Sequence, residues 1–166
     1  FEQLKQALAS KPLLVFPNWE KPFQVFTDAS GYQLGAVLTQ LDDEGNEQPV
    51  AYASRTMTEA ERRWHITEQE LAAILFGLTT FSHYLYGTEV TVFTDHQAAS
   101  FILKSPKLKL KLQRWAARLQ DWNITDILYR PGEKNAAADA LSRMPTTGLT
   151  DITPTEAEQE KVMGVC

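Results

Sequence analysis

The segments VFTDAS at 25–30 and VFTDHQAAS at 92–100 share one pattern, an apolar run rich in β-branched and aromatic residues that ends in an aspartate. Such runs predict short buried strands. If a right-handed crossover places the second strand parallel to the first, Asp28 and Asp95 lie side by side at the carboxyl ends of neighbouring strands. Open α/β sheets build their functional sites at this edge. Two adjacent carboxylates repel each other, so the arrangement calls for a cation or a protonated partner.

Around these segments, the spacing of apolar residues alternates between that of strands and that of helices. The predicted strands are 23–27, 34–41, about 49–55, 89–94 and 124–129. The predicted helices are 67 to about 83 with Thr67 as its N-cap, 97–103, 108–122 and 136–143. This order, βββαβααβα, predicts an α/β fold in which helices flank a mixed sheet that combines an antiparallel meander with parallel strands.

Two further carboxylates can reach the same edge of the sheet. Glu70 lies four residues before Ile74 and so borders the helix face that packs on the sheet, and Asp139 opens the last helix after the slim stretch 135–138. Four carboxylates without Cys or His supply hard oxygen ligands, which suit magnesium or manganese rather than zinc.

Each acid also has a purely structural interpretation. Asp28 can be a turn former, Glu70 can belong to a capping box with Thr67, and Asp139 can favour the first turn of a helix. The order and spacing of the four acids together favour the metal site.

Composition restricts the class of protein. The 166 residues, 43% hydrophobic and 22% charged, are typical of one globular domain. Cys166 is the single cysteine, so no intramolecular disulfide and no cysteine-based zinc site can form, and a reducing compartment fits. No apolar run approaches the roughly 18 residues of a membrane span, and the start of the chain lacks the pattern of a signal peptide. We therefore expect a soluble, unsecreted protein with no membrane partner. We also expect the chain to be a piece of a longer polypeptide.

The charge of the chain is unevenly distributed. The net charge is -5, yet residues 104–118, here called the basic stripe, contain no acid. Its six cations are candidate nucleic-acid-binding residues: Lys104, Lys107, Lys109, Lys111, Arg114 and Arg118. The alternative is an ordinary solvated helix face.

Several sequence motifs together resemble the ribonuclease H domain of gypsy-type LTR retrotransposon reverse transcriptases, which are parts of Pol polyproteins. They are TDAS at 27–30, TEQELAAI at 67–74, FTDH at 93–96 and YRPGEKNAAADALSR at 129–143. The resemblance extends over about residues 1–145 and implies an RNase H-like fold. It divides the chain into a leader from the upstream reverse transcriptase connection region (1–22), the RNase H domain (23–145) and a C-terminal linker or tail (146–166).

The resemblance also implies a function. The domain would hydrolyse the RNA strand of RNA/DNA hybrids during reverse transcription, with two Mg²⁺ ions for which Mn²⁺ can substitute, and would leave 5′-phosphomonoesters. Its metal ligands and catalytic residues would be Asp28, Glu70, Asp95 and Asp139. Many ribonucleases H carry a histidine before the last aspartate; this chain has none there, and Tyr129 is assigned an auxiliary role. The three histidines are interpreted as structural.

The implied partners are the RNA/DNA hybrid and the upstream polymerase region. A homodimer formed through the full reverse transcriptase is a further possibility. The implied location is the cytoplasm, in a virus-like particle. One alternative is a catalytically silent RNase H-like module for structure or dimerisation, or a domesticated retroelement fragment. A transposase or integrase core is disfavoured because those use an Asp, Asp, Glu order, whereas the order here is Asp, Glu, Asp, Asp.

Overall fold

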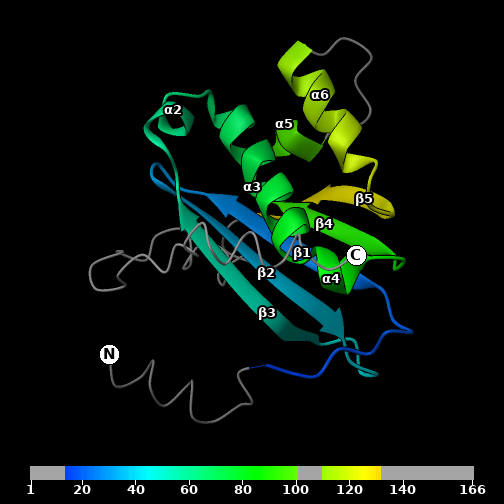
Figure 1. Ribbon diagram of the computed structural model, residues 1–166. Coiled ribbons are helices and arrows are strands. Elements are labelled where there is room, and N and C mark those ends of the chain that lie inside the picture. Colours follow the sequence, from blue (N-terminus) through cyan, green and yellow to red (C-terminus); the bar gives the residue numbers. More distant parts are fainter. Residues whose placement is uncertain (1–13, 101–109, 132–166) are drawn as a thin grey trace, which may run out of the picture.

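A computed structural model describes residues 14–100 and 110–131 of the chain (Figure 1). Its five strands form one sheet in the order β3-β2-β1-β4-β5. They are β1 (Phe23–Ala29), β2 (Gln33–Leu41), β3 (Glu47–Thr56), β4 (Val90–Thr94) and β5 (Ile124–Tyr129). The pairs β1–β2 and β2–β3 are antiparallel, whereas β1–β4 and β4–β5 are parallel. The predicted mixed sheet, a meander plus parallel strands, is confirmed.

The register between β1 and β4 aligns the repeated sequence pattern with itself. Phe26 is opposite Phe93 and Thr27 is opposite Thr94, so the aspartates that follow the two threonines leave the sheet at the same edge. The Phe26 and Phe93 rings stack with centroids 4.7 Å apart. Successive strand residues point to opposite faces, so Val25 faces the other way, into the main core.

Helix α3 (Ile66–Thr80) supplies the crossover between β3 and β4 and lies across one face of the sheet (Figure 1). Its buried Leu71, Ile74 and Leu78 pack in the main core with residues of β1, β2 and β4. Apolar residues at helical spacing make this face because a helix repeats every 3.6 residues. The other described helices are α2 (Glu59–Arg62), α4 (Ser82–Leu85), α5 (Gln97–Ser100) and α6 (Leu110–Leu119).

The start of α3 corrects the predicted N-cap. The cap is His65 rather than Thr67: the Thr67 N–H donates to His65 Nδ1 at 3.3 Å, and the His65 N–H donates to Glu68 Oε2 at 3.3 Å. An imidazole nitrogen can accept this hydrogen bond as a hydroxyl does, so the helix starts earlier than the Ser/Thr preference predicts. The capping box is therefore His65 with Glu68, and the alternative that paired Thr67 with Glu70 is wrong.

Other boundaries differ by a few residues. The helix predicted to run to about 83 ends at Thr80 and is followed by the separate α4, and the one predicted over 108–122 is described over Leu110–Leu119. The short α2 was not predicted, although Thr58 and Glu61 have the spacing of the capping box that starts it. The strand at 124–129 has the predicted bounds. The helix predicted at 136–143 and the tail lie outside the described residues.

The part of the leader that is described runs alongside β3, where the Val15 N–H donates to the Pro49 carbonyl at 2.8 Å. The division of the chain at 22 and 145 stays a prediction. Across the two described segments, no helix combines the length and apolar character that crossing a membrane requires.

Candidate metal centre

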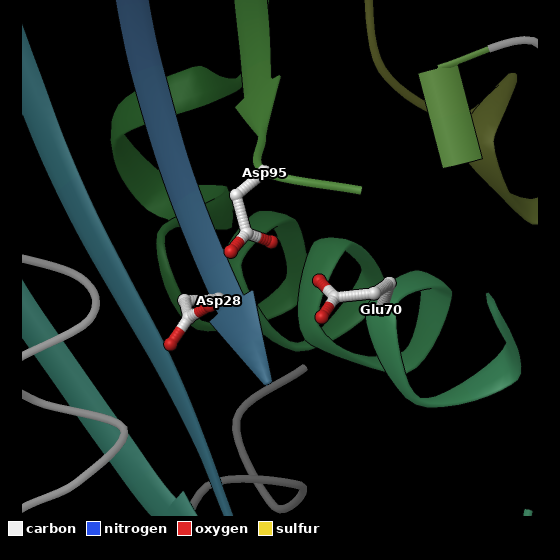
Figure 2. Close-up of side chains that lie close together, drawn as sticks. All are labelled: Asp28, Glu70 and Asp95. Carbon is white, nitrogen blue, oxygen red and sulfur yellow. The ribbon is translucent and has the colours of Figure 1, made fainter. Parts of the chain in front are cut away.

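Three carboxylates converge at the edge of the sheet where β1 and β4 end. Asp28 comes from the end of β1, Asp95 directly follows β4, and Glu70 comes from α3; Figure 2 shows the three side chains pointing toward one another. One oxygen atom from each lies within 4.8 Å of the others. The adjacency of Asp28 and Asp95 and the approach of Glu70 are as predicted.

Local hydrogen bonds fix the two strand ends that carry the aspartates. After β1, the Ser30 N–H donates to the Gln33 carbonyl at 2.9 Å and closes the turn into β2. After β4, the His96 N–H donates to Thr94 Oγ1 at 3.2 Å. Asp28 is therefore held in the last paired residues of β1, next to this turn, and Asp95 is held in the bend that follows β4.

The carboxylates are withdrawn from water. Glu70 is 2% exposed and Asp28 is 4% exposed, and Asp95 is partly buried. Burial and, less strongly, the negative charges of Asp95 and Asp28 together raise the pKa of Glu70 to about 9, although hydrogen bonds from the Ala29 N–H and the Thr94 side chain oppose the rise. The site therefore disfavours three negative charges in the absence of a compensating cation.

One oxygen of this centre has no hydrogen bond. Glu70 Oε2 is a buried acceptor without a partner in the described part of the chain. A buried, unpaired carboxylate oxygen among like charges is costly unless it binds a cation. Carboxylate oxygens alone are the ligands that Mg²⁺ and Mn²⁺ prefer, so the three residues fit such an ion.

The remaining predicted site residues are only partly described. Asp139 lies outside the described residues, as do Lys104, Lys107 and Lys109. Tyr129 ends β5 opposite Thr94, so it lies on the strand next to the one that carries Asp95, and it is 49% exposed. Its auxiliary role stays a prediction.

The described cations of the basic stripe differ in their surroundings. Arg114 and Arg118 are exposed on α6. Lys111 Nζ lies 3.4 Å from Glu68 Oε1 and 3.5 Å from the ring centroid of Trp64. The sequence analysis did not predict this contact between α3 and α6, because no local pattern predicts a contact between side chains that are 43 residues apart.

His96 follows Asp95 and is partly buried. Burial lowers its pKa, and the charge of His65 lowers it further. His65 caps α3, in agreement with the structural role predicted for it.

The family model of the RNase H-like domain found in reverse transcriptase matches residues 18–122. The Retrovirus-related Pol polyprotein from transposon opus of Drosophila melanogaster is 43% identical over 146 residues, which are 87% of this chain and 14% of that protein. The corresponding polyprotein from transposon gypsy of the same species is 36% identical over 159 residues, 95% of this chain and 15% of that protein. This chain thus spans a small fraction of the length of these relatives.

Solved structures share the fold. The foamy viral protease-reverse transcriptase in complex with RNA/DNA hybrid matches with a TM-score of 0.56 and 23% identity, over 92% of this chain and 20% of that one. RNase H1 from the halophilic archaeon Halobacterium salinarum matches with a TM-score of 0.54 and 20% identity, over 72% of this chain and 93% of that one. The predicted RNase H-like fold is confirmed.

Proposed function

Because the chain belongs to the family of RNase H-like domains found in reverse transcriptase, we propose that it is a magnesium-dependent endoribonuclease that hydrolyses the RNA strand of RNA/DNA hybrids during reverse transcription. The observation that carries the proposal is the convergence of Asp28, Glu70 and Asp95 at one edge of the sheet. The similarity to Pol polyproteins of gypsy-type elements supports the biological setting.

In this proposal, Asp28, Glu70 and Asp95, joined by Asp139, hold divalent ions. The bound ions would supply the activation of water and the stabilisation of the leaving 3′ oxygen that metal-dependent phosphodiester hydrolysis needs. The protein contributes placement. The Ala29 N–H and the Thr94 side chain hydrogen-bond Glu70, which leaves Oε2 as a ligand atom. The paired ends of β1 and β4 keep Asp28 and Asp95 together, where both would serve as metal ligands.

The proposed substrate follows from how A-form duplexes are recognised. A hybrid exposes the 2′-hydroxyls of its RNA strand across a wide, shallow minor groove, and cationic side chains can follow its phosphates. A solved relative of this fold was determined with an RNA/DNA hybrid. The proposed covalent partner of this chain is the upstream polymerase region of the polyprotein. Its proposed assembly is a homodimer formed through the full reverse transcriptase, and its proposed location is a cytoplasmic virus-like particle.

Cleavage of a labelled RNA/DNA hybrid by the 166-residue chain, with Mg²⁺, Mn²⁺ and Ca²⁺ in parallel, tests the proposal. We expect activity with the first two ions and none with Ca²⁺. Glu70→Gln should be inactive, and Glu68→Gln is the matched control because Glu68 faces α6 rather than the metal centre. At saturating Mg²⁺ we expect Glu68→Gln to cleave within a few-fold of the unmodified chain.

Two outcomes would contradict the proposal. A chain that folds and yet cleaves with none of the three ions would favour the silent structural module or the domesticated fragment. Activity that survives in Glu70→Gln would show that the cleavage comes from another site or from a contaminating nuclease.

A further inference from the structure

One cation of the basic stripe contacts two aromatic side chains and one acidic side chain. Lys111, at the start of α6, places its Nζ 3.5 Å from the ring centroid of Trp64 and 4.9 Å from that of Trp115, and 3.4 Å from Glu68 Oε1. The two indole rings contact each other with centroids 5.3 Å apart. We call Trp64, Glu68, Lys111 and Trp115 the Lys111 cluster.

The Lys111 cluster joins two helices where both begin. Helices α3 and α6 lie on the same face of the sheet and start at the same end of the molecule (Figure 1). An open cavity of about 330 Å³ is lined by Trp64 and Trp115 of the cluster together with Phe76, Thr79 and Arg118. The cluster therefore connects α6 to the first turn of α3, while Leu119 of α6 packs in the main core.

Glu68 links this connection to the start of α3. It is the N3 residue of the capping box, where its Oε2 accepts from the His65 N–H while Oε1 faces Lys111. Glu70 follows two residues later, and positions two apart point to nearly opposite sides of a helix. The first turns of α3 thus contact Lys111 on one side, through Glu68, and contribute Glu70 to the metal centre on the other side.

This segment needs a restraint. Glu70 is buried beside Asp28 and Asp95, so its ionised, metal-binding form is favoured by any rotation or fraying of α3 that returns the carboxylate to water. A cation between two indole faces and a carboxylate resists this motion, because both cation–π attraction and the ion pair are lost when the helices separate.

We propose that Lys111 is a positioning residue of the metal centre: by fastening the first turn of α3 to α6, it keeps Glu70 directed toward Asp28 and Asp95. The inference rests on the proposed function for its consequence in catalysis. It replaces the interpretation of Lys111 as a phosphate contact, since a lysine that moved to a phosphate would leave Glu68 unpaired next to a polyanion.

The test compares Lys111→Met, which keeps an apolar chain without charge, with Lys111→Arg, whose planar cation can stack on indoles. Thermal unfolding with increasing Mg²⁺ gives the metal affinity without any cleavage assay. We expect Lys111→Met to raise the Mg²⁺ concentration needed for half of the stabilisation by about tenfold, as losses of groups that orient metal ligands do. Lys111→Arg should restore most of the affinity. Arg63→Gln, which removes one charge from a side chain that is 82% exposed, should match the unmodified chain.

Glu68→Gln distinguishes positioning from phosphate contact by the sign of its effect. If Lys111 positions Glu70, Glu68→Gln weakens Mg²⁺ binding in the same direction as Lys111→Met, and the double variant is no worse than the poorer single variant. If Lys111 instead contacts phosphate, Glu68→Gln removes a repulsion and tightens hybrid binding, while Lys111→Met flattens the salt dependence of binding by about 0.7–0.9 in logarithmic slope.

Either of two results overturns the proposal: unchanged Mg²⁺ affinity in folded Lys111→Met, or additive effects of the two single variants. If Lys111→Met does not fold, we compare Lys111→Arg, Glu68→Gln and the unmodified chain. The proposal is rejected if these three proteins bind Mg²⁺ with the same affinity. An unmodified chain that is stabilised by Mg²⁺ but cleaves no hybrid refutes the proposed function alone, because the positioning of Glu70 is still measured by metal affinity.

Discussion

Asp28 and Asp95 are held closer together than two carboxylates would remain in water. Thr27 and Thr94 are paired across β1 and β4, so the strands themselves impose the separation. Strand pairing and core burial stabilise the protein enough to tolerate this local repulsion, which is the usual origin of a preformed cation site.

We expect Asp28→Asn and Asp95→Asn each to abolish cleavage while the metal-free protein stays folded or becomes more stable. Metal stabilisation of the reacting phosphate is worth several kcal/mol, which corresponds to a loss of about a thousandfold in rate. Relief of repulsion should raise stability in EDTA by up to about 1 kcal/mol. Single-turnover cleavage and urea unfolding measure the two effects. Near-normal activity in either variant would show that the metal-site assignment is wrong.

At the scale of elements, α3 lies close against the sheet at Gly77. A Cβ at this position would lie 3.0 Å from the Ala36 Cβ, 3.2 Å from Val25 Cγ1 and 3.3 Å from Thr27 Cγ2. Ala36 belongs to β2, which is paired on both sides and cannot easily move away. The close approach brings the helix that carries Glu70 down onto the strand that carries Asp28.

Gly77→Ala should destabilise the protein by about 1 kcal/mol. Alanine improves helix propensity by about 1 kcal/mol, but overpacking against paired strands costs about 1–3 kcal/mol, so the steric effect is larger. Urea unfolding provides the measurement, with Thr79→Ala on the exposed side of α3 as the control that should change stability little. A Gly77→Ala protein more stable than the unmodified chain would mean that the helix can shift away from the sheet.

A second contact between elements fastens α2 to β3. Arg55 donates two hydrogen bonds to Glu61, at 2.7 and 2.8 Å. The hydrogen bonds from Arg55 and, less strongly, those from Thr58 together lower the pKa of Glu61 to about 2. Since the folded pKa lies below the ordinary value of 4.5, the pair stabilises the fold above about pH 4.5, and this contribution is lost as the pH falls toward 2.

Glu61→Gln should therefore lower stability by about 1 kcal/mol at pH 7, a value reduced for solvent screening because the Arg55 side chain is 38% exposed. The difference from the unmodified chain should shrink between pH 4.5 and pH 2. Urea unfolding at several pH values checks this, with Glu59→Gln, at an 88% exposed side chain of the same helix, as the matched control. A penalty that is equal at pH 7 and pH 3 would contradict the pKa assignment.

At the scale of the whole molecule, a chain of net charge -5 would have to bind the proposed hybrid, a polyanion, through a local surface. The basic stripe is the candidate, and Lys111 is already engaged with Glu68 within it. If the proposed function holds, we expect the isolated domain to bind hybrid weakly and the proposed polymerase region to supply further affinity.

Substituting Lys107, Lys109 and Lys111 together by Gln should raise KM and flatten the salt dependence by about 0.9 in logarithmic slope per phosphate contact, with little change in the rate at saturating hybrid and Mg²⁺. Restoring Lys111 alone should leave the flattened slope unchanged, because this lysine serves α3 rather than phosphate. Binding titrations at several salt concentrations measure the slope. An unchanged slope in the triple variant would show that the substrate path lies elsewhere.

The sequence by itself determined the type and order of the main elements and the meeting of Asp28, Glu70 and Asp95. These follow from local pattern, because short apolar runs rich in β-branched and aromatic residues identify the strands and helical spacing orients Glu70. The crossover rule makes the two repeated strands parallel. The same reasoning predicts Asp139 as a fourth ligand.

Only the tertiary structure decided which side chains meet across elements. His65 rather than Thr67 caps α3, and Lys111 lies between Trp64, Trp115 and Glu68 instead of standing free on a helix face. Residues far apart in sequence become neighbours only when the helices pack on the sheet, and the energy of an ion pair or a cation–π contact depends on that final distance and burial. The spacing of residues along the sequence gives neither this distance nor this burial.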